Sequence, residues 1–132
     1  MRARYLAGLV FAAVAISGCG GGGDGGGPEE GVLRLTLDTP NTGDGAILFR
    51  VTGAVDSVQG GAMMQDGNYE TFPTFTRIVV AGNLTDGPVA YLFVPDVGDI
   101  SDYVVTVEQV AVKATHAQRS LTGYAVTVTK EP

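Results

Sequence analysis

Hydrophobic and polar residues alternate with a period of two along most of the chain from residue 32 onwards. Residues 33–37 read LRLTL and residues 124–129 read YAVTVT. This alternation, rich in β-branched and aromatic residues, is typical of half-buried strands. The pattern predicts strands near residues 32–38, 46–53, 54–59, 62–65, 69–80, 89–94, 103–113 and 120–129.

Clusters of Gly, Pro, Asn and Asp separate these runs, as in the PNTGDG segment at residues 40–45. Several short strands with turns at such spacing indicate a sandwich or barrel. About 100 residues suffice for one modest core. We therefore predict an all-β fold over residues 32–132, a single antiparallel β-sandwich of about seven to eight strands.

The stretch from residue 54 to residue 80 is the least regular part of this pattern. It contains two adjacent methionines and an FPTF segment, which would suit a loop or an edge strand, because Pro cannot donate to a strand ladder. An exposed patch of aromatic and Met side chains would form a binding site, whereas the same residues could fill the core. The candidate patch consists of Met63, Met64, Tyr69, Phe72 and Phe75.

The N-terminal segment differs from the rest of the chain. Arg2 and Arg4 are its only charged residues, and an almost purely apolar run of about 12 residues follows from Tyr5 to Ile16. This run is too short to span a bilayer, which takes roughly 20 apolar residues. We expect residues 1–18 to be a secretory signal peptide.

The segment Ile16-Ser17-Gly18-Cys19 resembles the lipobox of bacterial lipoproteins. The resemblance implies cleavage before Cys19 and attachment of lipid to that residue, which would anchor the protein to a membrane of the cell envelope. Several acyl chains anchor a protein firmly in a membrane, whereas a single chain gives only marginal binding. Gly20 stands where Asp resembles an inner-membrane retention signal in enteric bacteria, which favours the outer membrane.

A glycine-rich tether follows the predicted lipid site. The chain holds 20 Gly, and seven of them lie in residues 20–27. Such a stretch has high chain entropy and cannot form a core. Over about 11 residues its reach is roughly 18 Å. It lacks the sequence context of a phosphate-binding loop. Residues 19–31 are therefore predicted to be a flexible tether between lipid and domain.

The composition excludes several classes of protein. One Cys excludes an intramolecular disulfide, and one His excludes a multi-His metal centre. The formal net charge is −6, and without the signal peptide six basic residues face 14 acidic ones, giving −8. Such acidity argues against nucleic acid as a partner, because phosphate binding needs a basic surface.

Residues 92–105 resemble the corner between two strands of immunoglobulin-like domains, where an Asp precedes a Tyr by four residues, as Asp99 precedes Tyr103. The resemblance implies that the Tyr hydroxyl bonds to backbone just upstream. Val105 replaces the Cys of antibody domains, and the chain has no Trp, so only the sandwich architecture is implied. The strand-GD-turn-strand opening at residues 35–49 also resembles cohesin-like domains, which implies docking to another protein.

Catalytic chemistry has little support in the sequence. His116 is the sole imidazole, and it falls in a predicted loop between strands. A nucleophile such as Ser101 or Ser120 would have to lie within hydrogen-bond reach, and the GxSxG motif is absent. We expect a protein that is not an enzyme, with a small hydrolase as the remote alternative.

Acidic side chains offer a second candidate chemistry. Asp96, Asp99 and Asp102 recur every three residues and could supply oxygen ligands to Ca²⁺, although no known calcium-loop pattern is met. A similar set lies in the first turn, at Asp38, Asn41 and Asp44. Asp and Asn also favour turns for local backbone reasons. No other cofactor is expected.

These features together predict a lipid-anchored protein of the bacterial envelope with a structural or adhesive role. The expected partners are the membrane, through the lipid on Cys19, and a protein or glycan bound through loops or an open sheet edge. A Ca²⁺-binding or carbohydrate-binding module is the alternative.

Overall fold

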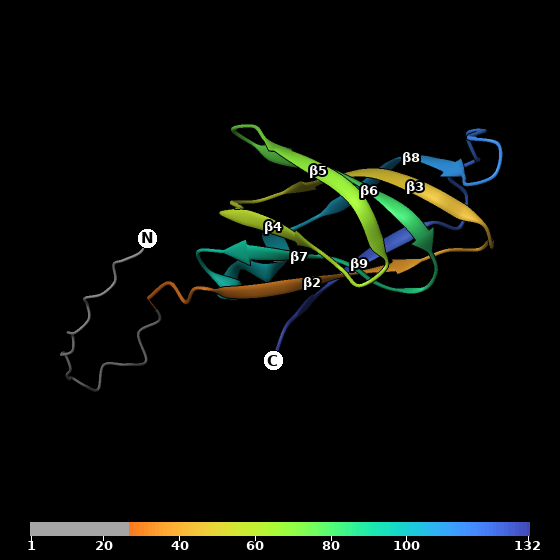
Figure 1. The fold of residues 1–132 in the computed structure, drawn as a ribbon. Coiled ribbons are helices and arrows are strands. Elements are labelled where there is room, and N and C mark those ends of the chain that lie inside the picture. The colour runs from red at the N-terminus through yellow and green to blue at the C-terminus, as the bar shows by residue number, and fades with distance from the viewer. Residues whose placement is uncertain (1–26) are drawn as a thin grey trace.

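The computed structural model describes residues 27–132. The predicted signal peptide, the lipobox Ile16-Ser17-Gly18, Cys19 and most of the tether lie outside the described residues. The described part forms eight strands and one short 3-10 helix (Figure 1). They are β2 (Gly31–Asp38), β3 (Asp44–Thr52), β4 (Ser57–Gly60), β5 (Met64–Thr71), β6 (Phe75–Leu84), β7 (Gly87–Val94), η4 (Val97–Asp102), β8 (Val105–Val112) and β9 (Ala125–Lys130).

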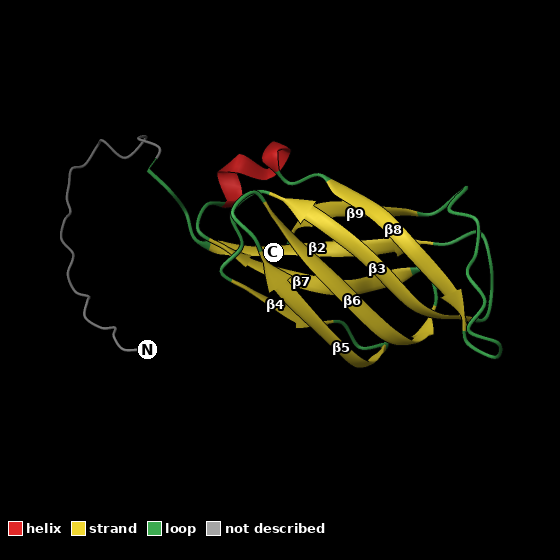
Figure 2. Cartoon of the chain, turned by 90° about the horizontal axis from the view of Figure 1, so that it is seen from above, coloured by secondary structure: helices red, strands yellow, loops and turns green. Residues whose placement is uncertain are grey.

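The strands form two four-stranded sheets that pack face to face, which confirms the predicted all-β sandwich (Figure 2). One sheet has the order β4-β7-β2-β9 and the other β5-β6-β3-β8, and every pairing is antiparallel. The strands β4 and β5 are therefore edge strands. No helix among residues 27–132 is long and apolar enough to cross a membrane.

The two ends of the sandwich have different loops. The proximal end, where β2 begins, carries η4, the C-terminus and the loops at residues 53–56 and 72–74. The distal end carries the loops at residues 39–43, 61–63, 85–86 and 113–124. Figure 1 shows the proximal end on the left and the blue distal loop on the right.

The core consists of the inward residues of both sheets. Leu33, Leu35 and Leu37 of β2 are almost completely buried, as are Phe49 and Val51 of β3. The polar residues between them face outward, because successive side chains of a strand point to opposite faces. The alternation read from the sequence therefore corresponds to one apolar face in β2 and β3.

The structure corrects the prediction for residues 54–80. The predicted strand 69–80 is two strands, because β5 and β6 form a hairpin whose turn spans residues 72–74. Pro73 lies in that turn, where it needs no ladder partner. Gly67 lies within β5 and Gly82 within β6, although both segments carry turn signals. Pairing with neighbouring strands outweighs local propensity at these positions.

Strand boundaries near two other turns also differ from the prediction. β4 begins at Ser57 rather than residue 54, and β9 begins at Ala125 rather than residue 120. Gly53 and Gly123 have φ angles of +96° and +88°. Such angles suit Gly and interrupt an extended strand, so each glycine lies in a turn that precedes its strand.

Tyr103 makes a different contact from the one that the immunoglobulin-like resemblance implies. Its hydroxyl donates a hydrogen bond to the carbonyl oxygen of Ala54, in the loop between β3 and β4, rather than to backbone just upstream. The ring packs against Gly53, where an added Cβ atom would lie 2.7 Å from two ring carbons. Tyr103 therefore fixes the 53–56 loop to the start of β8.

Candidate functional site

The structure divides the five residues of the predicted binding patch among three places. Met63 lies at the distal end, where its Sδ atom accepts a hydrogen bond from the backbone N–H of Thr85 at 3.3 Å. Phe72 and Phe75 stack on each other in the β5–β6 hairpin, with ring centroids 4.8 Å apart. Met64 and Tyr69 line a crevice between the two sheets.

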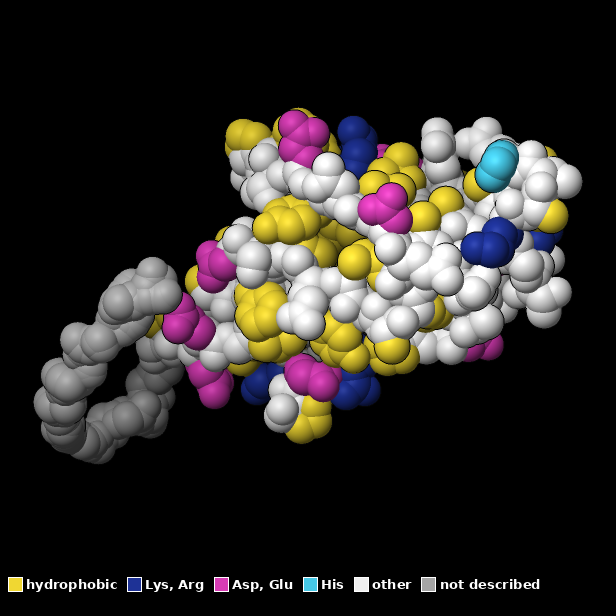
Figure 3. Space-filling view, viewed as in Figure 1, with side chains coloured by type: hydrophobic (Ala, Val, Ile, Leu, Met, Phe, Trp, Pro, Cys, Tyr) yellow, Lys and Arg dark blue, Asp and Glu magenta, His cyan; other side chains and the backbone are white. Residues whose placement is uncertain are grey.

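This crevice opens between the edge strands β4 and β5, on the side of the sandwich that faces the viewer in Figure 3. There, hydrophobic side chains line a hollow between the two layers. Its volume is about 180 Å³. We call it the edge crevice, and its lining residues are Val58, Gly60, Met64, Gly67, Asn68, Tyr69, Ile78, Val79, Val80 and Ala90.

Small residues at facing positions create the edge crevice. Gly60 is paired with Ala90 on one sheet, and Gly67 is paired with the buried Val80 on the other. Neither glycine supplies a side chain to fill the space between the sheets. The Met64 side chain lies against both glycines and partly fills it. Met is flexible and polarisable, and is common at adaptable binding surfaces.

Unequal strand lengths keep the edge crevice open. β4 has four residues and β5 has eight, so β5 extends beyond the strand that faces it. Tyr69 is opposite Ile78, a core residue, and therefore points toward the other sheet. Nevertheless its exposed fraction is 39%. Tyr69 thus presents an amphipathic ring at the mouth of an apolar hollow.

The surroundings of the edge crevice are acidic. Residues 51–76, which include β4, β5 and the connection between them, contain no Lys or Arg but contain Asp56, Asp66 and Glu70. Asp66 and Glu70 are paired with Ala81 and Arg77, on the outer face of the sheet. Arg77 forms its ion pair with Glu108 instead, at 2.9 Å. The acidic residues around the edge crevice favour a basic partner.

The Phe72–Phe75 pair lies on the outer face of the β5-β6-β3-β8 sheet, apart from the edge crevice. The guanidinium carbons of Arg50 and Arg77 lie 5.6 and 5.5 Å from the ring centroid of Phe75, within cation–π range. Both arginines approach the carboxylate of Glu108, at a bulge in β8. These contacts hold the hairpin against the sheet.

Of the predicted calcium ligands Asp96, Asp99 and Asp102, the first has a structural role of its own. Asp96 caps η4, and its Oδ1 atom accepts hydrogen bonds from the N–H groups of Gly98 and Glu29. The charge of Asp96 is the main reason that the pKa of Asp99 is raised, with smaller contributions from desolvation and from Asp102. Within residues 27–132, no three His, Cys, Asp or Glu side chains are placed to hold a metal ion.

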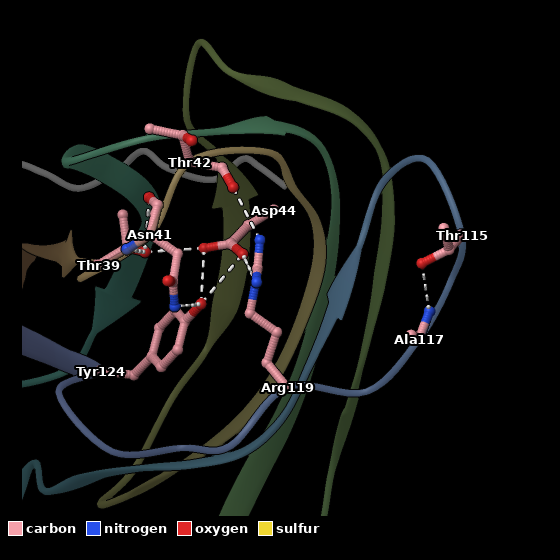
Figure 4. A network of polar contacts seen from close by, with 8 residues as sticks. All are labelled: Thr39, Asn41, Thr42, Asp44, Thr115, Ala117, Arg119 and Tyr124. Carbon is pink, nitrogen blue, oxygen red and sulfur yellow. Dashed lines mark hydrogen bonds and ion pairs between the residues drawn. The ribbon is translucent and has the colours of Figure 1, made fainter.

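The second candidate set contains a buried carboxylate that pairs with an arginine. Asp44 is 1% exposed, and its Oδ1 atom lies 2.6 Å from Nε of Arg119. It also accepts hydrogen bonds from the hydroxyls of Thr39 and Tyr124, at 2.7 and 3.0 Å (Figure 4). These contacts join the 39–43 loop to the 113–124 loop at the distal end. The exposed Asp38 takes no part in them.

His116 forms no hydrogen bond with either candidate nucleophile, Ser101 or Ser120, among the described residues. It lies in the distal 113–124 loop with a φ angle of +60°, whereas Ser101 lies in η4 at the proximal end. The hydroxyl of Ser120 bonds to that of Thr122 instead, at 3.2 Å. His116 borders an open depression of about 520 Å³ on the outer face of the β5-β6-β3-β8 sheet. The described residues thus contain no hydrogen-bonded His–Ser pair.

Comparison with protein-family models, with curated proteins and with solved structures found no match. The edge crevice therefore has to be interpreted from its own residues. Sequence reasoning found Met64 and Tyr69 but missed Gly60 and Gly67 as lining residues. A usable signal would have been their position in two consecutive edge strands, where glycines leave space on a buried face.

Proposed function

We propose that this chain is a lipid-anchored, non-catalytic protein of the bacterial outer membrane, whose β-sandwich binds a protein partner at the edge crevice. The anchor is the lipid on Cys19. The single observation that carries the binding role is an apolar hollow between two edge strands, closed on one side by Met64 and open beside Tyr69.

The size and lining of the edge crevice support a protein partner. A cavity of about 150 Å³ lined by apolar residues takes up a benzene-sized molecule, and the edge crevice has about 180 Å³. It therefore suits one large apolar side chain. Tyr is enriched at interfaces because it combines an apolar ring with a polar tip. Protein segments supply such side chains, whereas a glycan does not.

The position of the edge crevice also suits an anchored protein. The described strands begin at Gly31, at the proximal end, so a tether attached there leaves both long sides of the sandwich accessible. The edge crevice lies on one of these sides. The acidic domain would be repelled by an anionic lipid surface. A partner in the surrounding compartment could therefore reach the edge crevice without competition from the membrane.

Two comparisons test this proposal. Cys19→Ser should move the protein from the membrane fraction to the soluble fraction, and continued membrane association would contradict the anchor. For the binding site, the lipidated chain and its Tyr69→Ala variant are used to capture partners from its own envelope. Removal of an aromatic anchor costs about 2 kcal/mol, or about thirtyfold in affinity.

Phe93→Ala is the matched control, because Phe93 is 38% exposed but lies on the outer face of the other sheet. A partner lost with Tyr69→Ala and kept with Phe93→Ala supports the site. A partner that both variants retain equally contradicts it.

A further inference from the structure

Residues 66–70 of β5 alternate between the two faces of their sheet. Gly67 and Tyr69 point toward the core side of the sheet, because their partners Val80 and Ile78 are buried. Asp66 and Glu70 point to the opposite, outer side. β5 has a sheet neighbour on one side only, so no strand pairs with its other backbone edge. The N–H groups of Gly67 and Tyr69 donate to the side-chain oxygens of Asp66 and Asn68, at 2.8 Å each, so a strand that pairs with these groups has to replace those bonds.

A strand that pairs with β5 repeats this alternation. Directly opposed residues of neighbouring strands point to the same side of a sheet, and opposite charges at such positions stabilise the pair. Residues opposite Gly67 and Tyr69 would face the edge crevice and should be apolar. Residues opposite Asp66 and Glu70 would face outward and should be basic.

We infer that the partner of the edge crevice is an extended segment in which apolar and basic residues alternate, and that it binds by adding a strand to the free edge of β5. This inference rests on the proposed binding function of the edge crevice and specifies its partner. Main-chain hydrogen bonds supply affinity in such complexes, and pockets for alternate side chains supply specificity. Here the edge crevice is the pocket.

The charges of β5 argue against a second copy of this chain as the added strand. Two β5 strands side by side would bring Asp66 and Glu70 of each copy close to the same residues of the other. Like charges at opposed positions are destabilising. Native proteins protect edge strands with charged side chains, Pro or bulges, and β5 carries two acidic residues and an irregularity between Met64 and Asp66 but no Pro. Its edge therefore remains open to a strand of opposite charge.

The test uses the full chain in detergent and a synthetic peptide of eight residues, the length of β5, in which Leu and Lys alternate. The control peptide alternates Leu and Glu. Affinity is measured by titration, and backbone amide exchange is followed by NMR with and without peptide. We expect the Leu/Lys peptide to bind, the Leu/Glu peptide to bind much more weakly, and exchange to slow at amides of β5.

A charge-reversed variant tests the pairing of side chains. Asp66→Lys with Glu70→Lys should weaken binding of the Leu/Lys peptide by roughly tenfold to thirtyfold and strengthen binding of the Leu/Glu peptide, because two cross-strand attractions become repulsions. The matched control, Asp38→Lys with Asp102→Lys, changes the net charge equally at exposed sites away from β5. It should leave both affinities almost unchanged.

The outcomes separate this inference from the proposed function. Peptide binding that leaves β5 amide exchange unchanged, or that both charge variants weaken equally, overturns strand addition. Absence of peptide binding overturns it as well. In either case, partner capture that depends on Tyr69 would still support the proposed function.

Discussion

The buried carboxylate at the distal end offers a sharp test of how the loops there are held. Asp44 lies at the start of β3, and Arg119 lies in the long loop before β9. We consider Asp44→Asn, which preserves shape but removes the negative charge. The new amide group would place a donor where Arg119, Thr39 and Tyr124 all donate to the carboxylate.

The expected loss of unfolding free energy follows from the burial of the Asp44–Arg119 ion pair. Breaking a buried ion pair by removal of one partner costs about 3–5 kcal/mol. The Arg119 side chain is 23% exposed and can regain some hydration, so the lower limit applies, about 3 kcal/mol. For a domain near 100 residues, each kcal/mol lowers the melting temperature by roughly 4–8 °C. We therefore expect a decrease of roughly 12–24 °C.

The assay is thermal unfolding, with equilibrium unfolding in urea for the free energy, and both are followed by the fluorescence of the four tyrosines in residues 27–132, since the chain contains no Trp. The control is Glu131→Gln, which breaks the partly exposed ion pair with Arg34 and should cost less than about 1 kcal/mol. If Asp44→Asn is as stable as this control, the ion pair does not hold the distal loops together and the reasoning is refuted.

Three further predictions concern the proximal end. Tyr103→Phe should cost about 1 kcal/mol, through loss of the hydrogen bond to Ala54. Burial, followed by the charge of Asp99, raises the pKa of Tyr103 in the folded state. The stability that the neutral Tyr103 contributes should therefore be complete below about pH 10 and decrease as the pH rises through the folded-state pKa. Alkaline melting curves of Tyr103→Phe should lack this decrease. Gly53→Ala should cost about 2 kcal/mol in urea unfolding, because the positive φ angle and the Tyr103 ring both oppose a Cβ atom, and an unchanged midpoint would refute this. Asp99→Asn should raise the melting temperature at pH 7, because it removes the repulsion between Asp99 and Asp96. This increase should disappear as the pH falls below about 3.9, where wild-type Asp99 is also neutral. An increase that persists in acid would contradict the electrostatic cause.

The sequence predicts strands well where side-chain periodicity and burial agree. The alternation at residues 33–37 identifies β2, because its leucines all face the core. The same rule fails in β5, where the inward positions include a glycine and an exposed tyrosine. Apolar residues cannot mark a buried face at an edge that the other sheet leaves uncovered.

Contacts between distant segments are beyond local sequence patterns. Asp44 and Arg119 are 75 residues apart, and nothing near either residue indicates that they pair. The edge crevice has the same origin, because Gly60 and Gly67 read as turn residues and form a hollow only once β4 and β5 face each other. Sequence reasoning selected Tyr69 as a candidate, because an aromatic residue in an irregular region stands out without knowledge of its neighbours.

The most direct test of the central claim is photo-cross-linking in intact envelopes at two matched aromatic positions. Tyr69 or Phe93, which are 39% and 38% exposed, is replaced by the photo-reactive analogue p-benzoylphenylalanine in the full lipidated chain. We predict a covalent adduct to a discrete protein from position 69 and none of that size from position 93. The same adducts from both positions, or none from position 69, would contradict a binding role for the edge crevice.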